Sequence, residues 1–153
     1  NGIVIEDNVV YDNWAQNLYV SDVRNAIIQR NMIYNTPGNL VGNRRAPFTM
    51  ADERSDKPRS SSNRVINNFV FNAAFCAFCW TIVPGSGLDH ALIANNTIVD
   101  GEFKTGPNSI ASHVTNNLVI GTVSVPTASG LTFSHNLWAI HGLPGPDPQV
   151  PAR

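Results

Sequence analysis

Apolar and polar residues alternate over short segments of this chain, and one such segment recurs as six copies. Each copy has two short apolar segments separated by a polar residue and an asparagine. The asparagines that align the copies are Asn8, Asn31, Asn68, Asn96, Asn117 and Asn136. Since alternation with a period of two residues is typical of half-buried strands, each copy predicts a strand, a bend and a second strand.

Two apolar columns support this alignment. In every copy an apolar residue stands three positions before the asparagine and another stands two positions after it, whereas the residue directly before it is polar. The first apolar column is Ile5, Ile28, Val65, Ile93, Val114 and Phe133, and the second is Val10, Ile33, Val70, Ile98, Val119 and Trp138. The columns predict two layers of inward-facing side chains.

The spacing of the copies indicates the architecture. Successive asparagines lie 23, 37, 28, 21 and 19 residues apart, and about 20 to 24 residues make one turn of a parallel β-helix. Leucine-rich repeats would need a leucine consensus, and propeller blades need about 40 residues or more. The sequence predicts one all-β domain over 1–153, a parallel β-helix (solenoid) of about six coils. The longest spacing predicts a loop insertion at about 37–62.

The asparagines themselves have a structural explanation. Asparagine is depleted in strands because its side chain competes for backbone hydrogen bonds. Stacked at one corner, the six amides are expected to form a ladder that satisfies backbone groups left unpaired by the sheets. We therefore interpret these residues as scaffold.

Composition narrows the possible partners. Charged residues make up 14%, and the net charge is −1, so no nucleic-acid partner is expected. No apolar run reaches the roughly 18 residues that a membrane span requires. Low charge with many Asn, Thr, Ser and Val residues favours an extracellular or cell-surface protein. No capping helix is evident at either end, which predicts missing flanking coils or end-to-end self-association.

The two cysteines form a single C-x-x-C motif, Cys76 and Cys79, among aromatic residues. No further ligands are spaced for a zinc site. Two buried core or wall residues are the favoured interpretation, because free cysteines are often buried. A local disulfide is the alternative.

Three stretches resemble one family: "VRNAIIQRNMIYN" at 23–35, "VINNFVFN" at 65–72 and "ALIANNTIVDG" at 91–101. They are similar to right-handed parallel β-helix repeat proteins of the pectate lyase-like superfamily, which includes alginate lyases, mannuronan epimerases and secreted bacterial proteins. The resemblance covers nearly the whole chain outside the insertion. It implies a fragment of a longer secreted, carbohydrate-active protein that holds its ligand along one outer sheet, between long loops.

Candidate chemistry lies between the repeats. A third strand of each coil is expected within 17–23, 46–53, 74–83, 101–106 and 121–125, and the outward residues of these strands would share one face. The insertion adds Arg44, Arg45, Asp52, Glu53, Arg54, Asp56, Lys57 and Arg59, which are eight of the chain's ten basic and eleven acidic residues. A loop of this length is typical of either a binding loop or a solvated one.

A polysaccharide lyase must neutralise a uronate carboxylate and remove the adjacent proton. Lys104 is the candidate base and Arg54 the candidate clamp. The candidate calcium ligands are Asp52, Glu53 and Asp56. The candidate substrate contacts are Trp80, Tyr19, Arg44, Arg45 and Glu102. A glycoside hydrolase would instead use two carboxylates, such as Asp52 and Glu102.

Two functional hypotheses remain open. The first is a secreted protein that acts on acidic polysaccharide, by β-elimination. The second is a non-catalytic extracellular module that binds glycan or builds a surface assembly. The position of the charged segment 44–59 relative to Lys104 and Glu102 distinguishes them.

Overall fold

The computed structural model describes residues 2–38, 47–78, 83–125, 130–140 and 143–144, and all regular structure in these ranges is β-strand. No helix long and apolar enough to cross a membrane is found there. The strands are β1 (Val4–Glu6), β2 (Val9–Tyr11), β3 (Leu18–Ser21), β4 (Ile27–Gln29), β5 (Met32–Tyr34), β6 (Phe48–Ala51), β7 (Arg64–Ile66), β8 (Phe69–Phe71), β9 (Ala74–Ala77), β10 (Leu92–Ala94), β11 (Thr97–Thr105), β12 (Ser112–Thr115), β13 (Leu118–Ser124), β14 (Leu131–Ser134), β15 (Leu137–Ile140) and β16 (Leu143–Pro144).

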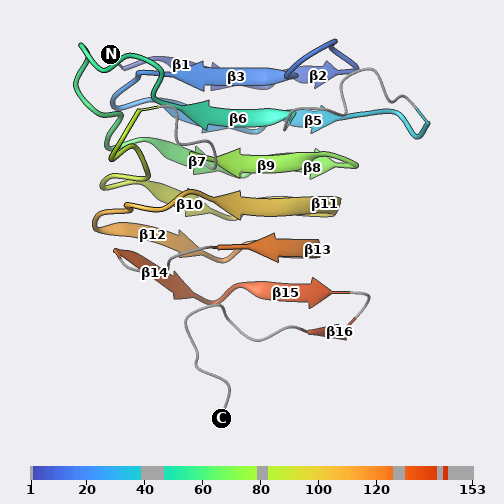
Figure 1. The fold of residues 1–153 in the computed structure, drawn as a ribbon. Helices are drawn as coiled ribbons and strands as arrows, with labels where there is room; N and C mark the ends of the chain where they lie inside the picture. Colours follow the sequence, from blue (N-terminus) through green and yellow to red (C-terminus); the bar gives the residue numbers. More distant parts are fainter. Residues whose placement is uncertain (1, 39–46, 79–82, 126–129, 141–142, 145–153) are drawn as a thin grey trace.

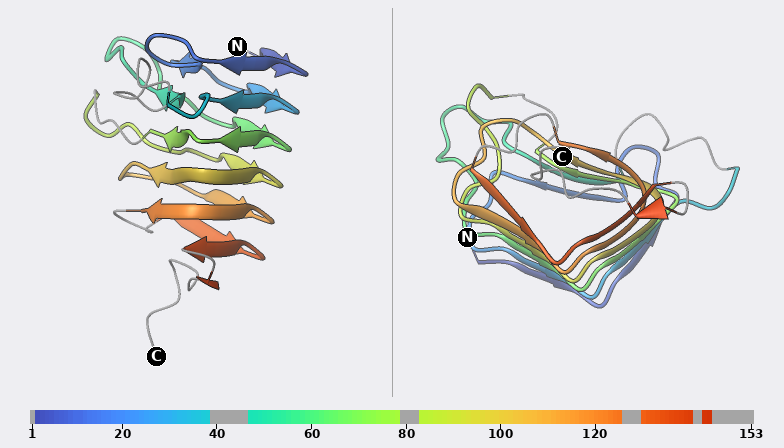
Figure 2. Two further views of the ribbon diagram at one scale, coloured as in Figure 1. Left: turned by 90° about the vertical axis from the view of Figure 1, so that its right-hand side faces the viewer. Right: turned by 90° about the horizontal axis from the view of Figure 1, so that it is seen from below.

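Each sequence repeat contributes one strand to each of two sheets. The first sheet is parallel and has six strands in the order β1-β4-β7-β10-β12-β14. The path β2-β5-β8-β11-β13-β15 in the second sheet follows the same chain order, and β16 ends it by pairing antiparallel with β15. Successive strand–bend–strand units therefore lie one upon another (Figure 1), and seen along the stack they nearly superimpose (Figure 2).

The second sheet also contains the predicted third strands. β3 pairs with β6, β6 with β9, and β9 with the second half of β11. β11 pairs with β8 through its first half, so it joins both parts of the sheet, and its register shifts between Val99 and Gly101. β6 lies within the predicted insertion at 37–62 and corresponds to the third strand predicted within 46–53. The described part of the insertion after β6 connects this strand to β7.

The predicted apolar columns face the interior. Ile28, Val65, Ile93 and Val114 are at most 1% exposed, and their counterparts in the second sheet are buried to a similar degree. Beside them, Phe48, Phe75, Phe103 and Trp138 form a stack with ring-centroid distances of 4.6, 5.4 and 5.6 Å. Burial of these large side chains is the main stabilising contribution that the sequence provides.

The polar column before each asparagine sets the bend. Asp7, Arg30, Asn67, Asn95, Asn116 and His135 all have φ between 55° and 59°. This left-handed conformation is unfavourable for most residues but more accessible to Asn, Asp and His, which occupy five of the six positions; Arg30 is the exception. The repeated polar position is thus explained by backbone geometry, and its side chains are exposed at the corner.

The six aligned asparagines are joined by hydrogen bonds. The amide Nδ2 of each of the first five donates to the Oδ1 of the next over 2.9–3.0 Å, along the series Asn8, Asn31, Asn68, Asn96, Asn117 and Asn136. The same Oδ1 atoms accept from the backbone N–H of the preceding asparagine at 2.9–3.2 Å. The column therefore satisfies backbone donors at the bend that no strand partner reaches.

Candidate functional site

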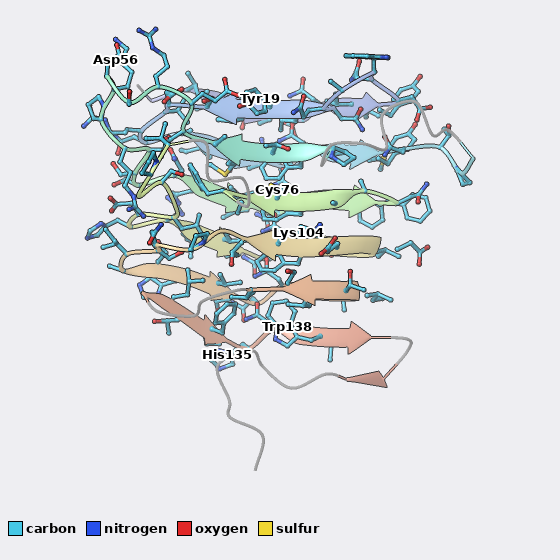
Figure 3. All side chains as sticks on the ribbon, in the orientation of Figure 1. Tyr19, Asp56, Cys76, Lys104, His135 and Trp138 are labelled. Atoms are coloured by element: carbon cyan, nitrogen blue, oxygen red, sulfur yellow. The ribbon has the colours of Figure 1, made fainter. Side chains whose placement is uncertain are left out.

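The outer face of the third strands presents a column of aligned residues. The strand register places Tyr19, Thr49, Cys76, Lys104 and Ser124 side by side, and we call them the outer column. Figure 3 shows Tyr19, Cys76 and Lys104 on successive levels of the stack. Thr49 and Cys76 are fully buried, whereas Tyr19 is 37% exposed and the Lys104 side chain is also 37% exposed. Solvent therefore reaches this face near its ends and not at its centre.

The ammonium of Lys104 forms an ion pair with a neighbouring carboxylate. Its Nζ lies 2.6 Å from Glu102 Oε2, and both side chains are partly exposed on β11. Residues two apart on a strand point to the same face, so the sequence itself favours this pair. The structure therefore brings Lys104 and Glu102 together, but as an ion pair. Lys104 is not a free base, and Glu102 is not a free substrate contact.

Tyr19 lies near the start of the stack, beside the segment that follows β6. Burial of the phenol, together with its hydrogen bond to Glu53, raises the pKa of Tyr19 to about 12. The hydroxyl therefore remains protonated over the physiological range. Glu53, a predicted calcium ligand, has Tyr19 as its partner.

The segment after β6 is anchored to the end of β3. The carboxylate of Asp22 accepts the backbone N–H groups of Glu53 and Arg54 at 3.4 and 3.2 Å. The Arg54 guanidinium binds Asp56 through Nε and Nη2 at 3.0 and 2.8 Å, and Lys57 Nζ lies 3.6 Å from the same carboxylate. The hydrogen bond from Arg54 lowers the pKa of Asp56.

The predicted base and clamp do not share a site. The Asp22 carboxylate, directly after β3, accepts the backbone N–H of Arg54, which follows β6; two strands, β6 and β9, lie between β3 and Lys104 on β11. Three strand spacings amount to roughly 14 Å along the stack. Figure 3 accordingly shows Asp56, the partner of Arg54, several levels away from Lys104.

The hydrolase pair is also separated. The register aligns Glu102 with Ala74 at the start of β9, whereas Asp52 follows the end of β6. The offset is five residues along the strand, roughly 16 Å at the usual rise. Glycosidase carboxyl pairs lie about 5–9.5 Å apart, so Asp52 and Glu102 do not have the geometry of such a pair.

The three predicted calcium ligands have three different partners. Asp52 is buried and accepts the Ser60 N–H at 3.1 Å, Glu53 bonds Tyr19, and Asp56 pairs with Arg54. Within the described ranges, no group of three or more His, Cys, Asp or Glu side chains could hold a metal ion. These carboxylates therefore do not form the oxygen cage that calcium requires.

Four sequence candidates concern residues outside the described ranges. They are Trp80, Arg44, Arg45 and Cys79. Cys76 lies in the described part of the chain. It is fully buried, as expected for a core residue, and it is disulfide-bonded, as the alternative interpretation expected.

The structure adds a feature that the sequence did not indicate, a cavity of about 230 Å³ between segments 52–59 and 83–86. Arg59 fixes its wall: the guanidinium donates to the carbonyl oxygens of Gly85 at 2.6 Å, Leu88 at 2.8 Å and Asn108. Its Nε also lies 3.4 Å from Asp89 Oδ2. The lining residues are Asp52, Arg54, Ser55, Lys57, Arg59, Val83, Pro84, Gly85 and Ser86. Only the charge density of 44–59 pointed toward this region.

Comparison with known proteins gave no match to a family model, a curated protein or a solved structure. Functional reasoning therefore rests on the geometry of this chain.

Proposed function

We propose that this chain is a right-handed parallel β-helix of six coils and acts as an extracellular module that binds acidic glycan without cleaving it. The handedness follows from the general preference of parallel crossover connections. The stacking of six strand–bend–strand units in chain order supports the coil number. Likeness to the pectate lyase-like superfamily is part of this proposal and rests on the repeat phrases alone.

The separation of Arg54 from Lys104 carries the non-catalytic part of the proposal. A lyase needs the carboxylate clamp and the base at the same uronate ring. Here each cation is instead held by its own carboxylate, Lys104 by Glu102 and Arg54 by Asp56. β-Elimination with Lys104 as the base is the competing proposal.

Acidic glycan is proposed as the partner because two exposed cations on an anchored segment, Arg54 and Lys57, share one carboxylate, Asp56. The side chains of Arg54 and Lys57 are 59% and 47% exposed, and Asp22 fixes the backbone that carries them. Guanidinium and ammonium groups bind carboxylates by charge-assisted hydrogen bonds. The disulfide at Cys76 supports an extracellular location, since disulfides persist in oxidising compartments.

One experiment separates the two proposals. The protein is incubated with pectate, alginate and glycosaminoglycans, with and without calcium, and unsaturated uronate is followed by ultraviolet absorbance while binding is measured by calorimetry. We expect binding without product, weakened by salt and by Arg54→Gln, and unchanged by the matched charge removal Arg64→Gln at an exposed position of the first sheet. Product formation that is lost in Lys104→Ala would overturn the proposal.

A further inference from the structure

We propose that the outer face of the second sheet is an interface at which two copies of this chain associate side by side. The outward side chains of β2, β5, β8, β11, β13 and β15, which lie one above another (Figure 1), form this surface, and we call it the apolar face. It contains none of the residues that carry the glycan proposal, so a failure of glycan binding has no bearing on it.

The strand register places the outward residues of the apolar face in two columns, with one residue from each strand in each column. The first column is Val9, Met32, Phe69, Thr97, Leu118 and Leu137, and the second is Tyr11, Tyr34, Phe71, Val99, Ile120 and Ala139. Eleven of the twelve are aliphatic or aromatic, and the twelfth is threonine. A continuous apolar surface therefore runs the length of the stack.

Solvent reaches this surface at several levels. Eleven large apolar side chains in the described part of the chain are at least 36% exposed, and six of them lie on the apolar face: Val9, Tyr11, Met32, Phe69, Ile120 and Leu137. Single exposed apolar residues are normal on a protein surface, but a large contiguous apolar patch marks an interaction site. The six residues form such a patch because the register joins them.

The outer face of the first sheet is different, although the same repeats build it. Its outward positions include Glu6, Gln29, Arg64, His113 and Thr132. Charged and polar side chains are thus compatible with outward positions of the stack. The apolar character of the second sheet is therefore not a requirement of the scaffold.

The charge of the apolar face favours a second copy of the chain as its partner. None of its twelve side chains is charged at neutral pH. Two such faces packed together leave no buried charge without a partner, which would otherwise be strongly destabilising. The strands of both copies are spaced by roughly 4.8 Å, so their side-chain rows interdigitate like those of two packed sheets.

Two other partners fit this face less well. An anionic membrane surface attracts Lys and Arg, but the face has neither, and the corner that follows it carries Asp12 and Asp100. A sugar ring stacks on a free aromatic face, but the rings of Tyr11 and Tyr34 lie 4.9 Å apart at 4°, so each covers one face of the other. An uncharged protein surface matches both observations.

The exposed area is large enough for such an interface. Large aromatic side chains have surfaces of roughly 150–250 Å², and at about this size the six residues that are 36–61% exposed present roughly 500 Å² on each copy. Two copies would bury roughly 1,000 Å² through these six alone, and the partly buried members of the columns bring the total toward the roughly 1,200–2,000 Å² of a stable interface. A two-fold axis makes the contact self-complementary and closes it at two copies.

Sedimentation velocity of the full chain over a concentration series tests the proposal. We expect a monomer–dimer equilibrium without larger species, and dimerisation at least tenfold weaker in Phe69→Lys and in Ile120→Lys, because each variant buries an unpaired ammonium in the interface. The matched control is Leu92→Lys, which places the same charge on the outer face of the first sheet, between Arg64 and His113. It should leave the dimerisation constant within twofold of wild type.

A second measurement needs no variant. Met32 is exposed on the apolar face, whereas Met50 is fully buried in the core. Oxidation of Met32 by peroxide, followed by peptide mass spectrometry, should therefore slow several-fold as the concentration rises through the dimerisation range. Oxidation that is independent of concentration would overturn the inference.

The sedimentation outcomes are equally decisive. A protein that is monomeric at all concentrations, an open series of larger species, or equal weakening by Leu92→Lys and Phe69→Lys would each contradict the interface. Phe69 lies two strands away from β2 at the end of the stack, so association through the ends predicts wild-type association in Phe69→Lys, and that result would also refute the proposal. Circular dichroism checks that each variant is folded, and the methionine measurement decides if neither is.

Discussion

Asn96 is the best position at which to test whether the asparagine column stabilises the stack. It is 1% exposed. Its Nδ2 donates to Val65 O at 2.9 Å and to Asn117 Oδ1 at 3.0 Å, and its Oδ1 accepts the backbone and side-chain N–H groups of Asn68 at 3.0 Å each. Asn96→Ala therefore removes four buried hydrogen bonds that connect three adjacent units.

The expected cost follows from the partners that remain. Asn117 Oδ1 still accepts the Asn96 backbone N–H at 2.9 Å, and Asn68 Nδ2 still donates to Ile28 O and Ile66 O. The Asn68 backbone N–H loses its side-chain acceptor. At about 1 kcal/mol for each hydrogen bond, with a range of about 0.5–1.5, the loss is about 4 kcal/mol. That is a large share of the 5–15 kcal/mol typical of a domain.

Equilibrium unfolding in urea, followed by circular dichroism, measures this loss as a shift of the midpoint at constant slope. Asn8→Ala is the matched control, because Asn8 is exposed at the end of the column and its Nδ2 makes two bonds, to Glu6 O and Asn31 Oδ1. Water replaces these, so the expected cost is about 1 kcal/mol or less. Equal losses in the two variants, or a loss below about 1 kcal/mol for Asn96→Ala, would refute the reasoning.

Three further predictions concern other parts of the fold. Glu53→Gln should lower the pKa of Tyr19 but leave it above the ordinary tyrosine value, because burial is the larger cause of the rise. Titration followed by tyrosinate absorbance measures the pKa, and an unchanged pKa in the variant would contradict the prediction. In the wild type, the raised pKa means that stability present below about pH 10 is lost as the pH rises toward 12. Gly121→Ala should lower the free energy of unfolding by about 2 kcal/mol, because the added Cβ would lie 2.0 Å from the Gly101 carbonyl oxygen. An unchanged free energy in urea unfolding would contradict this close contact. Val9 is 61% exposed on β2, which pairs only with β5 among the described strands. Val9→Lys should therefore reduce concentration-dependent self-association, measured by analytical sedimentation. A wild-type protein that is monomeric at all concentrations would contradict this prediction.

The repeated part of the structure was predictable because six copies constrain it. Ile93 and Ile98 are interpretable as inward-facing only because every other copy has an apolar residue at the same position, and their burial confirms the prediction. The residue before each asparagine was read only as polar, and its left-handed φ was not anticipated. A hydrophobicity pattern reports which face is buried, but it does not report φ.

The candidate site was less predictable because its residues have no counterparts in other repeats. Lys104 and Glu102 were both candidate site residues, but their ion pair was not predicted, although a spacing of two on one strand places them on the same face. Arg54 was placed with Lys104 because both carry charge, but the stacking level of a loop depends on its anchor, here Asp22. Ser86 lies in a connection that no sequence repeat marks, so only the structure shows that its hydroxyl is buried without a hydrogen-bond partner among the described residues.

The division between repeats and connections has a consequence for how such a chain acquires function. The inward columns and the asparagine column fix every strand against its neighbours, so a change in one of them disturbs the units above and below. The connections after the third strands do not contain these repeated columns. They are held in place by other contacts, such as those of Arg59, which donates to three carbonyl oxygens in two later connections. A polar cavity can therefore form beside the stack without altering any strand. For this reason the chemistry of the chain is expected in segment 52–59, which carries the exposed cations Arg54 and Lys57, and not in the asparagine column, whose members are joined one to the next.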